Sequence, residues 1–157
     1  MNKENIQGFE KLKNSIKTDF YEEKKRKWYE YLFTVLINLV LLYIANNILY
    51  WNLSFISSSF SEVLFAVNLS LIVRIVGNIS FILYHPPWFK HATKAVINIT
   101  ALLAAYMFYV VFPFTFSQYF IVVGLKIIII LAIIATVASI VYEIIRMLHA
   151  LSKDSEY

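Results

Sequence analysis

The chain has 157 residues, of which 60% are apolar, 15% are charged and none is cysteine. Soluble domains contain about 45–50% apolar residues, and the apolar share here stays at roughly 55% when Tyr and Gly are counted as in that norm. With a mean hydropathy of +0.66, the chain has more apolar surface than a folded domain in water can bury, and we expect lipid to surround that surface. The lack of cysteine excludes a disulfide scaffold, a Cys-ligated metal site and thiol catalysis.

Charge divides the chain into three parts. Residues 1–30 carry eight Lys/Arg and six Asp/Glu, whereas residues 31–148 carry only five basic and two acidic residues. We therefore expect a charged leader (1–30), a membrane domain (31–148) and a short cytoplasmic tail (149–157). Apolar residues at helical spacing between Asn5 and Phe20 predict an amphipathic leader helix on the inner leaflet, although a solvated leader or a protein contact is the alternative. The acidic residues of the leader favour anionic lipid over nucleic acid as its partner.

Four apolar segments follow the leader, and each reaches the length of about 20 residues that a helix needs to cross a membrane. Transmembrane strands are disfavoured because they alternate polar and apolar residues, whereas residues 127–131 are apolar on every face. The sequence thus predicts an all-α integral membrane four-helix bundle. Its predicted spans are residues 31–50, 60–84, 93–112 and 119–142.

Basic residues indicate the orientation of these spans. They precede the first span, lie between the second and the third and follow the fourth, whereas the other two loops contain no Lys or Arg. This distribution predicts a multi-pass cell-membrane protein with both termini in the cytoplasm. The frequent Ile, Asn and Lys residues suggest a prokaryotic source. The fourth helix is expected to project into the cytoplasm, where Glu143 and Arg146 would support one another at a spacing of three residues.

Arg74 is the most informative residue of the membrane domain. It lies near the middle of the second span, and no carboxylate is expected at its depth. Ser70 and Asn78 share its helical stripe, and Asn38 and Asn98 fall at depths similar to that of Asn78. We expect these residues to form a polar layer in the inner leaflet with Arg74 one turn above it. The layer would be a vestibule or anion site, or, for the asparagines, hydrogen-bonded contacts between helices.

Other charged or aromatic residues lie near the ends of the spans. Glu62 and Lys126 are placed to pair near the outer surface if their helices touch. Pro86 is expected to help end the second helix and begin a loop that contacts headgroups or a cytoplasmic partner. The residues expected to make that contact are Trp88, Lys90, His91 and Lys94. The histidines lack the spacing and the nearby carboxylate of a zinc site, so no metal and no cofactor are expected.

These features leave two main functional hypotheses. The first is a homo-oligomeric channel or transporter subunit, since four spans are few for a path within one chain. The second is a non-transporting scaffold, immunity-type or accessory protein that acts through its cytoplasmic surfaces. The sequence contains no phosphate loop, nucleophile elbow or pair of catalytic carboxylates, so an enzyme is not expected.

Overall fold

The computed structural model describes residues 28–84 and 86–154, which form four helices. The first helix runs over Trp28–Asn47, and it is followed by α2 (Phe60–Leu83), α3 (Pro87–Val111) and α4 (Tyr119–Asp154). Each helix is long and apolar enough to cross a membrane, which confirms the prediction of four long apolar helices. The predicted leader helix between Asn5 and Phe20 lies outside the described residues.

The two prolines between α2 and α3 place the helix boundary differently from the sequence prediction. Tyr84 ends α2 in an extended conformation, and α3 begins at Pro87 rather than near residue 93. Proline fits the first turn of a helix because its missing N–H would have no partner there. The segment predicted as a headgroup-contacting loop, residues 88–94, is therefore the first two turns of α3.

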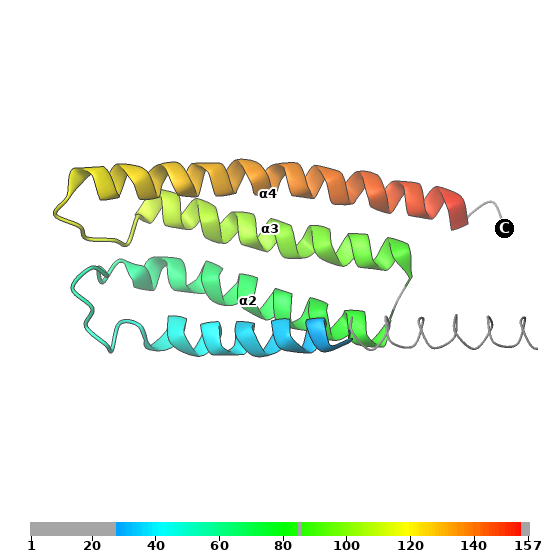
Figure 1. Ribbon diagram of the computed structural model, residues 1–157, viewed down its shortest axis with the longest axis horizontal. Helices are drawn as coiled ribbons and strands as arrows, with labels where there is room; N and C mark the ends of the chain where they lie inside the picture. The colour runs from blue at the N-terminus through cyan, green and yellow to red at the C-terminus, as the bar shows by residue number, and fades with distance from the viewer. Residues whose placement is uncertain (1–27, 85, 155–157) are drawn as a thin grey trace, which may run out of the picture.

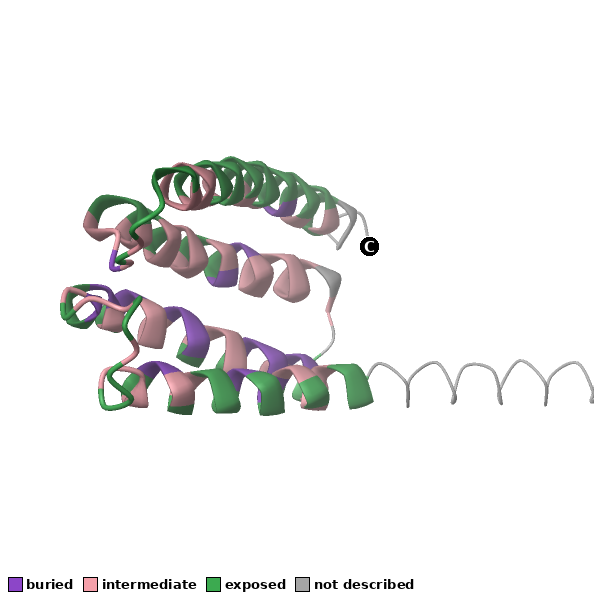
Figure 2. Ribbon diagram, turned by 60° about the vertical axis from the view of Figure 1, so that its left-hand side comes forward, coloured by how far each residue is buried: buried purple, intermediate pink, exposed green. Residues whose placement is uncertain are grey.

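The four helices lie side by side in chain order, as Figure 1 shows. The first helix packs on α2, α2 contacts α3, and α3 contacts α4, but α2 and α4 do not touch. The predicted bundle is thus an open row within one chain. Figure 2 shows the consequence for burial, since α4 is exposed along most of its length whereas buried residues concentrate on α2.

The loops at one end of the row join its two halves. Ile56 forms an antiparallel bridge with Phe114, and the Ser57 N–H donates to the Pro113 carbonyl over 3.0 Å. Six phenylalanine rings pack in a chain of contacts around this bridge; they belong to Phe55, Phe60, Phe108, Phe112, Phe114 and Phe116. We call this the paired-loop end, formed by residues 48–59 and 112–118, and the opposite one the terminal end.

Gly77 sets the distance between α2 and α3. A Cβ atom at this position would lie 2.7 Å from Cδ1 of Ile97 and 3.1 Å from Cγ2 of Thr93, both on α3. A contact this short requires the neighbouring side chains to move, so glycine permits the close approach of α2 to α3. Gly124 on α4 provides a contrast, because a Cβ there would meet no atom within 4 Å.

We therefore predict that Gly77→Leu destabilises the protein by about 1–3 kcal/mol, the usual cost of overpacking a close contact. Thermal unfolding of the purified protein in detergent would measure the change. Gly124→Leu is the matched control and should alter stability by no more than about 0.5 kcal/mol. Equal effects of the two substitutions would contradict this account of the α2–α3 contact.

Candidate functional site

Polar side chains within the helices mostly hydrogen-bond to their own backbone. Asn38 Nδ2 donates to the Thr34 carbonyl over 2.7 Å, and Asn78 Nδ2 donates to the Arg74 carbonyl over the same distance. Thr136 and Ser139 likewise donate to carbonyls four residues earlier. These donors are therefore used within single helices and do not form the contacts between helices that the sequence suggested.

An amide pair joins the first helix to α2 nearer the paired-loop end. Asn46 Nδ2 donates to Asn68 Oδ1 over 2.9 Å, and Asn68 Nδ2 donates back to Asn46 Oδ1 over 3.0 Å. Sequence reasoning did not select this pair. Both asparagines are visible in the sequence because they interrupt strongly apolar segments. That they lie opposite one another depends on how the first helix and α2 align, which the sequence does not show.

Arg74 lies in the central part of α2, nine residues before the end of the helix at Leu83, or about 13 Å along its axis. Its side chain is half-buried. Among the residues that the structure describes, no hydrogen-bond acceptor or carboxylate is paired with its guanidinium group. An unpaired cation at this depth is costly in lipid, which makes Arg74 the first candidate for function.

The packing of the first helix on α2 places Asn38 at about the level of Arg74. The rings of Tyr31 and Phe81 pack with centroids 5.4 Å apart, which fixes the register of these two antiparallel helices. Contacts between packed helices repeat about every seven residues. Asn38 lies seven residues after Tyr31 and Arg74 lies seven residues before Phe81, so the two residues lie at about the same level on neighbouring helices.

Asn38 carries a polar atom that has no partner. The residue is only 3% exposed, and its Oδ1 atom is fully buried without a hydrogen bond. Its Nδ2 atom is held by the Thr34 carbonyl, so the amide orientation is fixed with the acceptor free. A buried acceptor and an unpaired cation therefore lie on facing helices.

The remaining residues of the predicted layer lie around this level. Because Gly77 approaches α3 between Thr93 and Ile97, Arg74 is level with about Asn98. Asn38 and Asn98 thus lie within about one helical turn of Arg74 along the row. Ser70 and Asn78 are buried one turn to either side of Arg74.

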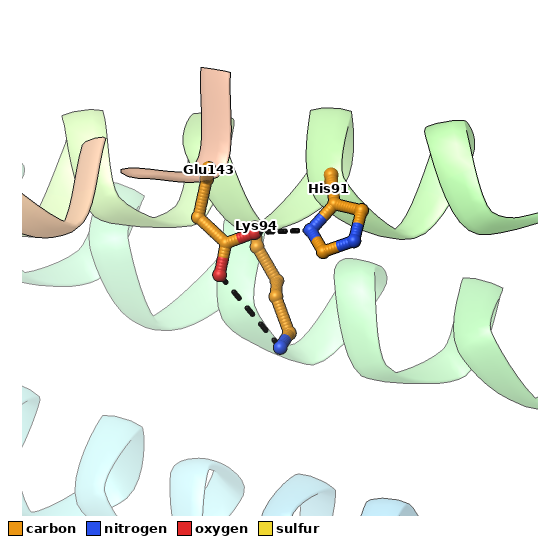
Figure 3. A network of polar contacts seen from close by, with 3 residues as sticks. All are labelled: His91, Lys94 and Glu143. Atoms are coloured by element: carbon orange, nitrogen blue, oxygen red, sulfur yellow. Dashed lines mark hydrogen bonds and ion pairs between the residues drawn. The ribbon is translucent and has the colours of Figure 1, made fainter. Parts of the chain in front are cut away.

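A polar cluster that the sequence did not predict joins α3 to α4 toward the terminal end, as Figure 3 shows. Glu143 is only 8% exposed, and its Oε2 lies 2.6 Å from His91 Nδ1. Its other carboxylate oxygen lies 3.7 Å from Lys94 Nζ. The expectation that no carboxylate lies near His91 is therefore wrong, because the antiparallel packing of α3 and α4 brings together residues 52 positions apart.

This cluster also changes the role expected for Glu143. The sequence placed Glu143 beside Arg146 on an exposed helical surface, but Glu143 faces α3, while the Arg146 guanidinium lies 6.0 Å from the Tyr142 ring. His91 and Lys94 bind this carboxylate within the protein. The described residues contain no group of three or more metal-ligating side chains.

Other predicted residues lie apart from these two sites. Glu62 is exposed on α2, and Lys126 Nζ on α4 lies 5.1 Å above the Phe112 ring. Because α2 and α4 do not touch, one chain does not bring Glu62 and Lys126 together. Trp88 packs edge-on against Phe89, and Lys90 is half-buried in the first turn of α3.

Comparison of the chain with protein-family models, with curated proteins and with solved structures finds no match.

We predict that Glu143→Ala lowers the free energy of unfolding by about 1.5–3 kcal/mol, because hydrogen bonds to a charged group in a buried contact contribute about this much. Thermal unfolding in detergent would measure the loss. A double-mutant cycle with His91→Ala should give a coupling of about 0.5–3 kcal/mol. Glu62→Ala is the control at an exposed position, and a loss as large as that of Glu143→Ala would refute the buried contact.

Proposed function

We propose that the protein is a subunit of a homo-oligomeric channel or transporter for small anions. The observation that carries this proposal is Arg74, a half-buried cation in the central part of α2 without a carboxylate partner among the described residues. An anion that approaches Arg74 supplies the charge that the protein does not supply itself. The planar guanidinium offers up to five donors to such a ligand.

The open row supports an oligomeric arrangement for this function. In a row of four helices each helix is flanked by at most two others, and a single chain does not enclose a path. Symmetric copies of the row would enclose one. The most apolar helix, α4, is also the most exposed and has surface available for contact with lipid or with another subunit.

The positions of Lys and Arg residues indicate how the helices are oriented in the membrane. We infer a multi-pass protein of the cell membrane, of prokaryotic origin, with both termini in the cytoplasm. The loops of the paired-loop end contain no Lys or Arg, whereas Lys90, Lys94 and Arg146 lie toward the terminal end. Trp88 and Lys90 in the first turn of α3 then lie at the level of anionic headgroups. The sequence before the first helix contains eight further basic residues, which is consistent with a cytoplasmic N-terminus.

One observation favours the scaffold function as a second candidate. The His91–Glu143 contact places Pro87 level with Met147, so α4 continues for about seven residues beyond the start of α3. This projecting end exposes Leu148 and Leu151. An exposed helix end with apolar side chains is suited to contact a cytoplasmic or membrane protein.

We predict that Arg74→Ala reduces anion flux into liposomes at least tenfold, because the mutation removes the cation that stabilises an anion in the membrane interior. The test reconstitutes the full chain and measures chloride, nitrate and bicarbonate uptake separately. Arg146→Ala is the control, since Arg146 lies beyond the central part of the row. Wild-type flux in a folded Arg74→Ala protein would exclude the transport function and leave the scaffold function.

A further inference from the structure

We propose that His91, Glu143 and Lys94 form a proton-binding site between α3 and α4, in which a proton taken up at His91 Nε2 releases Lys94 from Glu143. The ligand of this site is the proton. The inference goes beyond the proposed anion function and does not rest on it, because it concerns a different cluster of side chains.

Glu143 is the buried anion of the site. Its side chain is 10% exposed, and both carboxylate oxygens have a partner, since Oε2 lies 2.6 Å from His91 Nδ1 and Oε1 lies 3.7 Å from Lys94 Nζ. A buried carboxylate is costly unless a positive charge compensates it. The charge of His91 therefore decides how strongly Glu143 depends on Lys94.

The hydrogen bond to Glu143 identifies the atom of His91 that takes up the proton. An ionised carboxylate only accepts hydrogen bonds, so Nδ1 donates to it and the lone pair of a neutral ring lies on Nε2. Figure 3 shows Nε2 on the side of the ring away from Glu143. Nε2 is also not enclosed, because in the described part of the chain the only buried side-chain N or O atom without a partner is Asn38 Oδ1. A proton can therefore bind Nε2 while the hydrogen bond to Glu143 stays in place.

The site lies close to the terminal end of the row. His91 is four residues after the start of α3 at Pro87, or about 6 Å along the helix axis. Histidine is the side chain that ordinarily changes charge between about pH 5 and 8. His91 is therefore placed to exchange a proton with water at the terminal end.

Other charged and titratable groups surround the site without binding its carboxylate. In the three helices packed around it, the nearest are Lys90 on α3, Tyr142, Arg146 and His149 on α4, and Arg74 and Tyr84 in or beside α2. Within the described residues none of them contacts the Glu143 carboxylate, and the Arg146 guanidinium lies 6.0 Å from the Tyr142 ring. Of the two groups that hold Glu143, only His91 ordinarily changes charge in this pH range.

Protonation of His91 changes which cation Glu143 needs. With a neutral His91, Lys94 alone balances the carboxylate and the cluster has no net charge, whereas protonation adds one positive charge in excess. The cation that is held less closely then leaves. Lys94 lies 3.7 Å from the carboxylate and its side chain is 42% exposed, whereas His91 lies at 2.6 Å and is 16% exposed. Lys94 therefore moves its ammonium group into water, as long basic side chains readily do.

NMR of the full chain in detergent tests the release, with 13C-labelled histidine and lysine. The imidazole resonances report the charge of His91, and the order parameter of Lys94 Cε reports whether that side chain is held. From about pH 8 to about pH 5, we expect this order parameter to fall with the same midpoint as the His91 titration. Lys126, which lies over the Phe112 ring at the paired-loop end, is the internal control and should show no such fall.

Three variants assign the effect to the cluster. His91→Gln keeps a hydrogen-bond donor for Glu143 but takes up no proton, so Lys94 should stay ordered across this pH range. Glu143→Gln removes the negative charge, so Lys94 should be mobile throughout. His149→Gln is the matched control, because it removes an exposed histidine of α4 and should leave the wild-type behaviour unchanged. A fall in His91→Gln equal to that of the wild-type protein would overturn the proposal.

The wild-type protein alone can also overturn the proposal. A His91 titration without a fall in the Lys94 order parameter would show that Lys94 is not released. A His91 ring that does not titrate between about pH 5 and 8 would show that the site binds no proton in this range. Neither result needs a folded variant. The measurements involve no anion flux, so failure of the transport function would leave the proton-binding site standing.

Discussion

The structure depends on one constraint, which is that lipid offers no hydrogen-bond partner to a polar group. Within each helix, backbone N–H and C=O groups bond to one another. Side chains such as those of Asn38, Asn78 and Thr136 then donate to backbone carbonyls four residues earlier. Where donors or acceptors remain, they meet across helices, as in the Asn46–Asn68 pair and the His91–Glu143 contact. Among the described residues, Arg74 and Asn38 Oδ1 lack such partners although they lie within the helices, which makes them the first candidates for function.

Much of the fold could be predicted because lipid makes long apolar segments into helices whatever their packing. The four spans follow directly from this rule. The arrangement of the helices does not follow from hydropathy. The choice of neighbouring helices depends on how side chains fit together, as Gly77 does against Ile97. The start of α3 was misplaced for a local reason, since the polar residues after Pro87 were read as a loop although proline suits a first helical turn.

The candidate site was predictable in its residues but not in its pairings. A single Arg in an apolar segment is visible in the sequence, and so are Asn38 and Asn98. Their common level depends on the antiparallel register, which is set by contacts such as that of Tyr31 with Phe81. Glu143 was assigned to the wrong surface for the same reason, because helical spacing shows its neighbour Arg146 but cannot show His91 on another helix.

The bridge between Ile56 and Phe114 has a consequence for the order of assembly. It joins two loops 58 residues apart, each of which connects the two helices of one hairpin. A contact of this kind cannot form until both hairpins are folded and lie side by side, since each hairpin supplies one of its two halves. Formation of the bridge therefore marks the packing of the second hairpin on the first, and the six phenylalanine rings around it come together only at that step.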